Sequence, residues 1–385
     1  MKHYGNFLIA LSAVLILLSG CSYIERVSGD RAAWAEKAQS DVTIGVAYPV
    51  KEIDSTTQYI KGIKLAVDEI NSNDGINGRK IKLLVEDDAA SVTTGAAIAQ
   101  SFTENPEIMA VVGHWNSRVS VAVAGIYEKA GIVMMTPAST SPELAQKGYK
   151  YIFSQIPSDE KIGKVMAEYA AQKGYERIII YYADDEYGRG LANSFEDNAK
   201  INGIKVVDRV TEFGNGQYFQ SLLDRWNAFS YDAFFIADVM PDGGAFVEKL
   251  RSNGIHTPIL GATGLDRSSF IEMLGDRADG TVVPTLFNPH STNPQTKLFV
   301  SNFEDRYRKQ PDVWAAQGYE TIKILAYAIE KAQSTVPSEI ASALHKLENW
   351  EGITGTLHFH ESGKIEGKII TKKVVENGKF QYLEN

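Results

Sequence analysis

From residue 41 onwards, short runs of apolar residues alternate with longer segments whose apolar residues recur at helical spacing. The run at 42–47 is typical of a buried strand, and residues 55–71 place apolar side chains on one helical stripe. The alternation continues with strands expected at 80–86, 109–113 and 132–136 and with helices at 95–105 and 119–130. Strands that alternate with helices in this way pair in parallel, so the order predicts a doubly wound α/β sheet.

A second series of the same kind follows. Its expected helices and strands lie at 161–173, 177–182, 190–202, 204–209, 218–229, 233–236, 245–252 and 258–261. Two such units predict two α/β lobes, and we expect a helix at 315–332 and a strand-like tail at 356–380 to complete one lobe each. Ligands bind beyond the carboxyl ends of strands in open α/β sheets, so a site is expected in the cleft between the lobes.

The N-terminus has the pattern of an export signal. An apolar run at 7–18 follows Lys2 and fits the central region of a signal peptide better than a membrane-spanning helix. It ends in the sequence LSGC, which resembles the bacterial lipobox, and Cys21 is the single cysteine of the chain. We therefore predict a signal peptide at 1–20, lipidation of Cys21, a tether at 21–40, and a membrane-anchored lipoprotein on the periplasmic face.

The composition excludes two further classes. With one cysteine there is no disulfide framework, so stability must come from packing in two lobes of ordinary domain size. The net charge of -9 arises from interspersed acidic and basic residues without a basic stripe, which argues against a nucleic-acid partner.

Seven short segments of the chain form a recognisable series. They are GIKLAVDEIN (62–71), GINGR (75–79), EDD (86–88), VGHWNS (112–117), TPASTSPEL (136–144), DEYGRG (185–190) and GYE (318–320). In their order and spacing these segments resemble the leucine/isoleucine/valine-binding protein family, and the resemblance covers residues 41–385. The resemblance implies a type I periplasmic-binding fold with three crossovers, lobe 1 at 41–157 and 286–352, and lobe 2 at 158–285 and 353–385. It also implies a monomeric receptor of an ABC importer, with permease subunits as partners and a small carboxylate as ligand, such as a branched-chain or other aliphatic amino acid.

Two strand-to-helix junctions are candidates for holding the ligand's α-carboxylate. Ser117 lies at one, and Ala138, Ser139 and Thr140 lie at the other. Hydroxyls and backbone N–H groups at such junctions can receive an anion. The alternative is that Ser117 and Ser141 only cap their helices. In the similar family, the positions matching Ser117, Ala138 and Thr140 hold the carboxylate, and the resemblance implies the same role here.

Three aromatic residues could line the rest of the pocket. Tyr187 follows the first strand of the second lobe, where its ring could cover an aliphatic side chain, with ordinary loop packing as the alternative. Tyr48 and Trp115 end strands of lobe 1, and each either walls the pocket or belongs to the core.

The family pattern is broken where the ligand's ammonium should bind. In leucine-type binders an acid within the segment matching 261–264 pairs with the α-amine, and Thr263 stands there instead. A hydroxyl cannot balance that charge in a closed, dry cleft. Asp238, after the expected strand at 233–236, is the first candidate replacement, although a solvated loop aspartate explains it equally well. Asp184 and Asp266 are the next acids to consider.

An enzyme is not expected, nor is a cofactor or metal. The sequence GRG at 188–190 lacks the third glycine of a dinucleotide fingerprint, since Asn193 takes its place. His358 and His360 would share one face of a strand and could bind a metal, but an exposed tail strand explains them better. Two alternatives stay open: a sensing or scaffold lipoprotein with the same fold, and a ligand without an α-amine, such as an amide or organic acid.

Substitution of Cys21 by serine should abolish membrane association, because one lipidated residue is the only evident anchor. Each buried methylene of an acyl chain contributes about 0.8 kcal/mol, so several chains hold a protein firmly. Membrane fractionation of the wild type and the serine variant measures this directly. A serine variant that still pellets with membranes would show that the anchor lies elsewhere.

Overall fold

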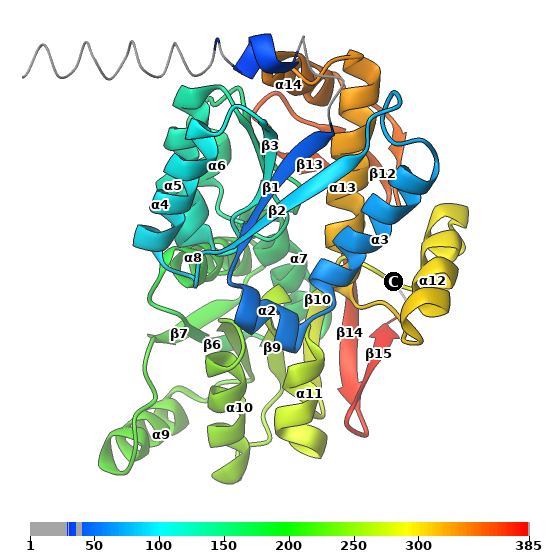
Figure 1. Cartoon of the computed structure of the whole chain (residues 1–385). Helices are drawn as coiled ribbons and strands as arrows, with labels where there is room; N and C mark the ends of the chain where they lie inside the picture. The colour runs from blue at the N-terminus through cyan, green and yellow to red at the C-terminus, as the bar shows by residue number, and fades with distance from the viewer. Residues whose placement is uncertain (1–28, 30, 36–40, 384–385) are drawn as a thin grey trace, which may run out of the picture.

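The computed structural model describes residues 29, 31–35 and 41–383, and it confirms an α/β protein with two lobes (Figure 1). Lobe 1 contains a five-stranded sheet in the order β2-β1-β3-β4-β5, and lobe 2 contains a seven-stranded sheet in the order β15-β14-β10-β9-β8-β6-β7. A small sheet of order β11-β12-β13 is attached to lobe 1. The predicted signal peptide, Cys21 and most of the predicted tether lie outside the described residues.

The lobe 1 sheet is covered on both faces. Its strands are β1 (Val42–Tyr48), β2 (Ile81–Asp87), β3 (Ile108–Gly113), β4 (Val133–Thr136) and β5 (Ile152–Ser154), all parallel. Helices α3 (Tyr59–Ser72) and α13 (Val313–Ala332) pack on one face, and α4 (Val92–Glu104) and α5 (Ser117–Ala130) pack on the other. Strands β1, β3 and β4 are buried along their whole length, as their continuous apolar runs predict.

Lobe 2 repeats this arrangement with a mixed sheet. Its strands are β6 (Arg177–Tyr182), β7 (Lys205–Val210), β8 (Ala233–Ala237), β9 (Ile259–Gly261), β10 (Thr281–Thr285), β14 (Thr371–Glu376) and β15 (Lys379–Leu383). Helices α7 (Asp159–Gln172) and α8 (Glu186–Ile201) cover one face, and α9 (Gln217–Phe229), α10 (Asp242–Ser252) and α11 (Ser268–Leu274) cover the other. Strands β14 and β15 run antiparallel to their neighbours, because a hairpin from the chain's end completes the sheet.

The third crossing between the lobes differs from the expected position near 352. Strands β12 (Thr356–Phe359) and β13 (Ile365–Glu366) stay with lobe 1, where Leu357, Phe359 and Ile365 are buried in its core. The alternating burial of β12 gives it one apolar face, and that face packs on lobe 1. The crossings therefore lie at 155–158, 286–293 and 367–370, and helices α12 (Pro294–Tyr307) and α14 (Pro337–His345) belong to lobe 1.

Part of the predicted tether is packed rather than extended. The guanidinium of Arg31 donates from Nε to the carbonyl of Ile108 at 3.0 Å and from Nη2 to the carbonyl of Thr103 at 2.6 Å. Arg31 is 1% exposed, and burial lowers its pKa to about 10. These contacts join the segment before β1 to the end of α4 and the start of β3.

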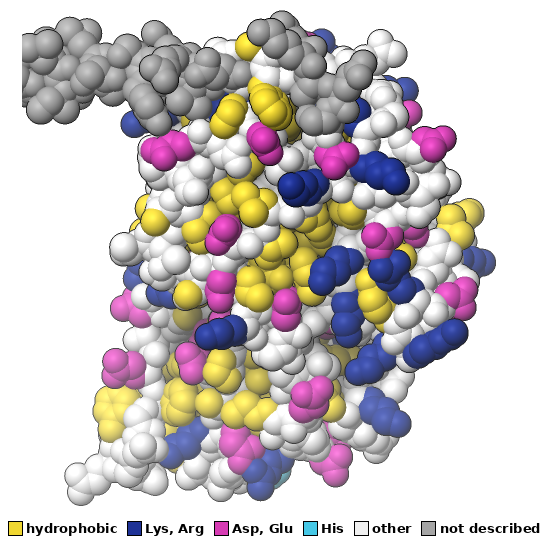
Figure 2. Space-filling model, in the orientation of Figure 1, with side chains coloured by type: hydrophobic (Ala, Val, Ile, Leu, Met, Phe, Trp, Pro, Cys, Tyr) yellow, Lys and Arg dark blue, Asp and Glu magenta, His cyan; other side chains and the backbone are white. Residues whose placement is uncertain are grey.

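The surface carries charges of both signs on both lobes, with hydrophobic side chains gathered over β2 on lobe 1 (Figure 2). Leu84 and Val85 of that edge strand are exposed. Within the described residues, no helix has the length and apolar character needed to cross a membrane.

Two glycines let α3 and α13 cross closely, and one of them gives a test of this packing. A Cβ at Gly62 would lie 1.9 Å from the carbonyl oxygen of Ala315, and a Cβ at Gly318 would lie 2.6 Å from that of Tyr59. Gly62→Ala should therefore lower the free energy of unfolding by about 1–3 kcal/mol in urea titrations, because α13 must move away.

Gly125→Ala in α5 is the matched control, since a Cβ there meets only the Tyr149 hydroxyl at 3.5 Å. It should be neutral or stabilising by up to about 1 kcal/mol. Equal effects of the two substitutions would contradict the close helix crossing.

Candidate functional site

The two strand-to-helix junctions of lobe 1 meet at the edge of its sheet. Ser117 is the first residue of α5, and the Ser139 hydroxyl in the loop after β4 donates to the Ser117 hydroxyl at 3.3 Å. The residue in the capping position is Asn116, whose side chain makes no capping hydrogen bond. Ser117 is therefore not the capping residue of α5, and its hydroxyl faces the second junction.

The loop after β4 is folded by the Thr136 hydroxyl. This group donates to the carbonyl of His114 at 2.7 Å and accepts from the amides of Ser139 at 3.0 Å and Ala138 at 3.4 Å. The Ser139 amide is thus used within the loop, which differs from the expectation that N–H groups here are free for an anion. The Thr140 hydroxyl, in contrast, is buried without a hydrogen-bond partner among the described residues.

Ser141 bridges the lobes instead of acting only as a cap. Its hydroxyl accepts from the amide of Glu143 at 3.3 Å and donates to the Glu186 carboxylate at 3.0 Å. Glu186 opens α8 of lobe 2, so the loop after β4 contacts the opposite lobe directly.

A buried polar chain supports the first junction from behind. The Nδ1 atom of His114 lies 2.7 Å from the Asp88 carboxylate, and its Nε2 atom lies 3.2 Å from the Tyr127 hydroxyl. All three side chains are fully or almost fully buried. His114 is therefore occupied on both ring nitrogens and holds the loop that leads to Ser117.

Lobe 2 contributes a carboxylate that sequence reasoning missed. Asp159 begins α7, is 0% exposed, and both of its carboxylate oxygens lack a hydrogen-bond partner among the described residues. Burial raises its pKa from 3.8 to about 7; nearby Thr140 opposes this rise, and the charges of Glu186 and Asp185 add to it. An acid in the first turn of a helix is common for reasons of helix dipole alone, so the sequence carried no signal of this role.

Tyr187 lies in the same region. Its hydroxyl is buried without a partner that meets hydrogen-bond geometry, close to Thr263 and Gly264. Burial raises the pKa of Tyr187, and the charges of Asp159 and Asp238 raise it further. Tyr187 is therefore close enough to both acids to sense their charges, and Thr263 lies beside it, 5% exposed.

Asp238 is not a solvated loop aspartate, since it is 3% exposed. Its Oδ1 atom accepts from the amide of Val239 at 2.7 Å, and burial raises its pKa to about 7. Asp184 is paired with Arg189 on the surface, and Asp266 is paired with Lys373 at 2.7 Å. Of these four acids, Asp159 alone has neither oxygen hydrogen-bonded.

Aromatic rings of lobe 1 meet an arginine of lobe 2. Trp115 packs against Tyr59 and Trp314, with ring centroids 5.0 Å and 4.7 Å apart. The Arg267 guanidinium lies 5.9 Å and 6.0 Å from the ring centroids of Trp115 and Trp314, and its Nε atom has no partner among the described residues. Trp115 therefore lies between the lobes.

Tyr48 differs from Trp115. It is buried in the lobe 1 core, and its hydroxyl donates to Asp54 at 3.1 Å.

The two histidines of the tail have separate partners. His358 pairs with Glu366 at 3.2 Å, and His360 bonds to the Ser362 hydroxyl at 2.8 Å. The described ranges contain no group of three or more His, Cys, Asp or Glu residues that could hold a metal ion.

Comparison with known proteins identifies the family to which this two-lobed arrangement belongs. Residues 41–379 match the family model described as periplasmic binding protein. The chain belongs to this family. Periplasmic binding proteins act outside the cytoplasm, which places this one on the extracytoplasmic side. The lipid anchor at Cys21 and the permease partner stay predictions.

Individual proteins that are similar to this chain confirm the family resemblance seen in the sequence. The chain is 25% identical over 377 residues to Leu/Ile/Val-binding protein homolog 1 of Brucella suis, covering 96% of this chain and 99% of the relative. A substrate-binding protein of an ABC transporter from Desulfitobacterium hafniense, solved in complex with Leu, is 41% identical with a TM-score of 0.82 and covers 89% of this chain and 100% of its own. A branched-chain amino acid transporter protein from Streptococcus pneumoniae, in complex with isoleucine, is 25% identical with a TM-score of 0.79 and covers 89% and 98%. These relatives are binding proteins of transport systems and not enzymes.

The raised pKa of Asp159 predicts a pH dependence of stability in the ligand-free protein. Because its folded pKa of about 7 exceeds its usual 3.8, the folded state holds a proton that the unfolded state has lost between these values. Stability should therefore fall as the pH rises from 4 to 7. Asp159→Asn should reduce this slope by about 1.4 kcal/mol per pH unit in urea titrations.

Asp184→Asn is the control for this measurement, because the Asp184 side chain is exposed. It should leave the slope unchanged. An Asp159→Asn variant whose slope equals that of the wild type would exclude the raised pKa.

Proposed function

We propose that this periplasmic binding protein is the receptor of an ABC importer and closes around a branched-chain amino acid. The observation that carries the proposal is the Asp159 carboxylate, buried without a partner near the unpartnered hydroxyls of Thr140 and Tyr187. A buried anion is stable only when it is paired or protonated, so an α-ammonium group is the natural occupant. The leucine and isoleucine bound by the two solved relatives support the same ligand class.

Each part of an amino acid has a matching group. The α-carboxylate would contact the hydroxyls of Ser117 and Thr140, at the junction that Ala138 and Ser139 complete. The α-ammonium would pair with Asp159, with the Thr263 hydroxyl as an additional acceptor. The side chain would lie against the rings of Tyr187 and Trp115, while Tyr48 supports the pocket from the core.

Asp159 takes precedence over Asp238 as the ammonium partner for a geometric reason. Asp238 already accepts a hydrogen bond from Val239, and nearby Tyr181 is a second donor. No contact of Asp159 reaches full hydrogen-bond geometry among the described residues, and its nearby donor is the hydroxyl of Thr140, a residue of the opposite lobe. An ammonium at Asp159 would thus bridge the lobes, which is what drives closure in a hinged receptor.

The alternatives differ in what they require of these groups. A sensing or scaffold lipoprotein would use the same site without a permease. Transport assays with the cognate permease subunits would separate this function from that of an importer receptor. An organic acid or amide without an α-amine would leave Asp159 buried and unpaired, so it fits the site less well.

Calorimetry with L-leucine tests the proposal. Asp159→Asn should weaken binding by about 2–5 kcal/mol, because one partner of a buried charge pair is lost. Asp238→Asn and Ser117→Ala should have smaller effects, since other groups keep their contacts. Near pH 6.5 the wild type should also release a proton on binding, seen as a heat that changes with the buffer, and Asp159→Asn should not.

Asp184→Asn is again the control and should bind as the wild type does. A loss in Asp238→Asn that exceeds the loss in Asp159→Asn would return the role to Asp238. Failure of the wild type to bind any aliphatic amino acid would overturn the proposed ligand class.

A further inference from the structure

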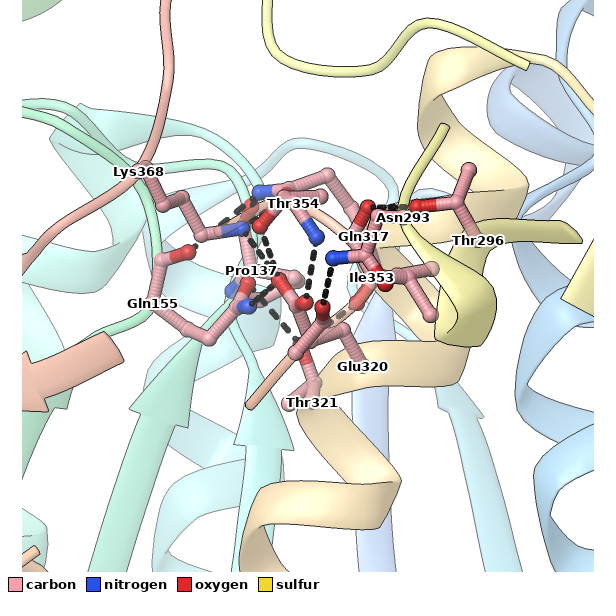
Figure 3. A network of polar contacts seen from close by, with 11 residues as sticks. Pro137, Gln155, Asn293, Thr296, Gln317, Glu320, Thr321, Ile353, Thr354 and Lys368 are labelled. Atoms are coloured by element: carbon pink, nitrogen blue, oxygen red, sulfur yellow. Dashed lines mark hydrogen bonds and ion pairs between the residues drawn. The ribbon is translucent and has the colours of Figure 1, made fainter. Parts of the chain in front are cut away.

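Helix α13 carries a buried polar cluster to the place where the chain crosses between the lobes (Figure 3). Gln317, Glu320 and Thr321 lie on this helix and are 0% exposed. The Nζ atom of Lys368, from the third crossing, donates to Glu320 Oε2 at 2.8 Å and also bonds to Gln317 Oε1. A single lysine of the third crossing therefore bonds to two side chains of α13.

Glu320 gathers donors from other segments as well. Gln155 of the first crossing donates from Nε2 to Glu320 Oε2 at 2.8 Å. Thr354 donates its hydroxyl to Oε2 at 2.6 Å and its amide to Oε1 at 3.0 Å. The turn that contains Thr354 is in turn held by Asn293, at the end of the second crossing, which donates to the carbonyl of Gly352 at 3.0 Å. The first and third crossings are thus bonded directly to one carboxylate, and the second reaches it only through this turn.

Gln317 extends this cluster to the ligand loop. Its Nε2 atom donates to the carbonyl of Pro137 at 2.8 Å, while its Oε1 atom accepts from Lys368. Pro137 opens the segment that ends in Thr140, whose hydroxyl is one of the unpartnered groups of the site. A chain of two hydrogen bonds therefore joins the third crossing to the carboxylate end of the site.

Stability alone is a weak explanation for this arrangement. The side chains of Lys368 and Glu320 are both 0% exposed, and burial lowers the pKa of Lys368, although Glu320 opposes the shift. The desolvation of such a pair often cancels its attraction, and apolar residues of similar volume frequently stabilise as much. What apolar residues cannot do is fix the direction of the Gln317 amide.

We propose that Lys368 is a positioning residue for ligand binding. Its bond to Gln317 fixes the direction of the Gln317 amide, and this amide holds the loop 137–140 in place as long as the third crossing stays packed against α13. This inference rests on the proposed function, because it concerns the same loop. Movement of the third crossing during opening would release Gln317 and loosen the loop. Ligand binding and hinge position are coupled through this one side chain.

Two variants separate positioning from stability. Lys368→Met combined with Glu320→Gln removes both charges and leaves no unpaired ion, and Gln317→Met breaks the bond to Pro137 without touching the Lys368–Glu320 pair. Both should weaken L-leucine binding about two- to thirtyfold in calorimetry. Both should also accelerate amide hydrogen exchange at 138–140 in the ligand-free protein, with exchange in the central strands of the lobe 1 sheet unchanged. Combining all three substitutions should add little, since they interrupt the same chain.

Lys331→Met is the control, because Lys331 is exposed in the last turn of α13, about three turns beyond Glu320. It should change neither quantity. Wild-type affinity and loop protection in the Lys368→Met, Glu320→Gln protein would overturn the proposal; if that protein does not fold, Gln317→Met decides in the same way. If the wild type does not bind L-leucine, the proposed ligand has failed, and the exchange data still decide the role of Lys368.

Discussion

The Glu320 carboxylate sets how the two lobes are joined. It has no contact with solvent, and its charge is balanced by Lys368 and satisfied by Gln155 and Thr354. Because these donors come from segments far apart in the sequence, the carboxylate holds the crossings in one bundle. The proposed ligand site lies beside this bundle, because Asp159 directly follows the first crossing and its amide donates to the carbonyl of Thr140 at 2.9 Å.

The proposed ligand site is chemically unequal on its two sides. Lobe 1 offers hydroxyls, from Ser117, Ser139 and Thr140, and lobe 2 offers acids, from Asp159 and Asp238. Burial raises the pKa of both acids to about 7, so the lobe 2 side is poised between neutral and charged near physiological pH. A zwitterion satisfies such a pair of surfaces in one orientation only, since reversing it would bring its carboxylate against the acids.

The sequence predicts the sheets well and the crossings less well. Continuous apolar runs mark β1, β3 and β4 because these strands are buried on both faces. The predicted position of the third crossing is wrong because β12 and β14 both alternate more buried and more exposed residues. That pattern does not show which lobe's core each strand joins. Ser117 and Thr140 follow from their junctions, whereas Asp159 reads as an ordinary helix-start acid. Only the three-dimensional contacts show that its oxygens are unpartnered.

The arginine between the lobes has an optical consequence. Arg267 of lobe 2 lies over two of the five tryptophans in the chain, Trp115 and Trp314, and both indoles belong to lobe 1. Separation of the lobes removes the cation from both rings and admits water to the Trp115 face. The emission of these two tryptophans should therefore change when the lobes separate, without any attached label.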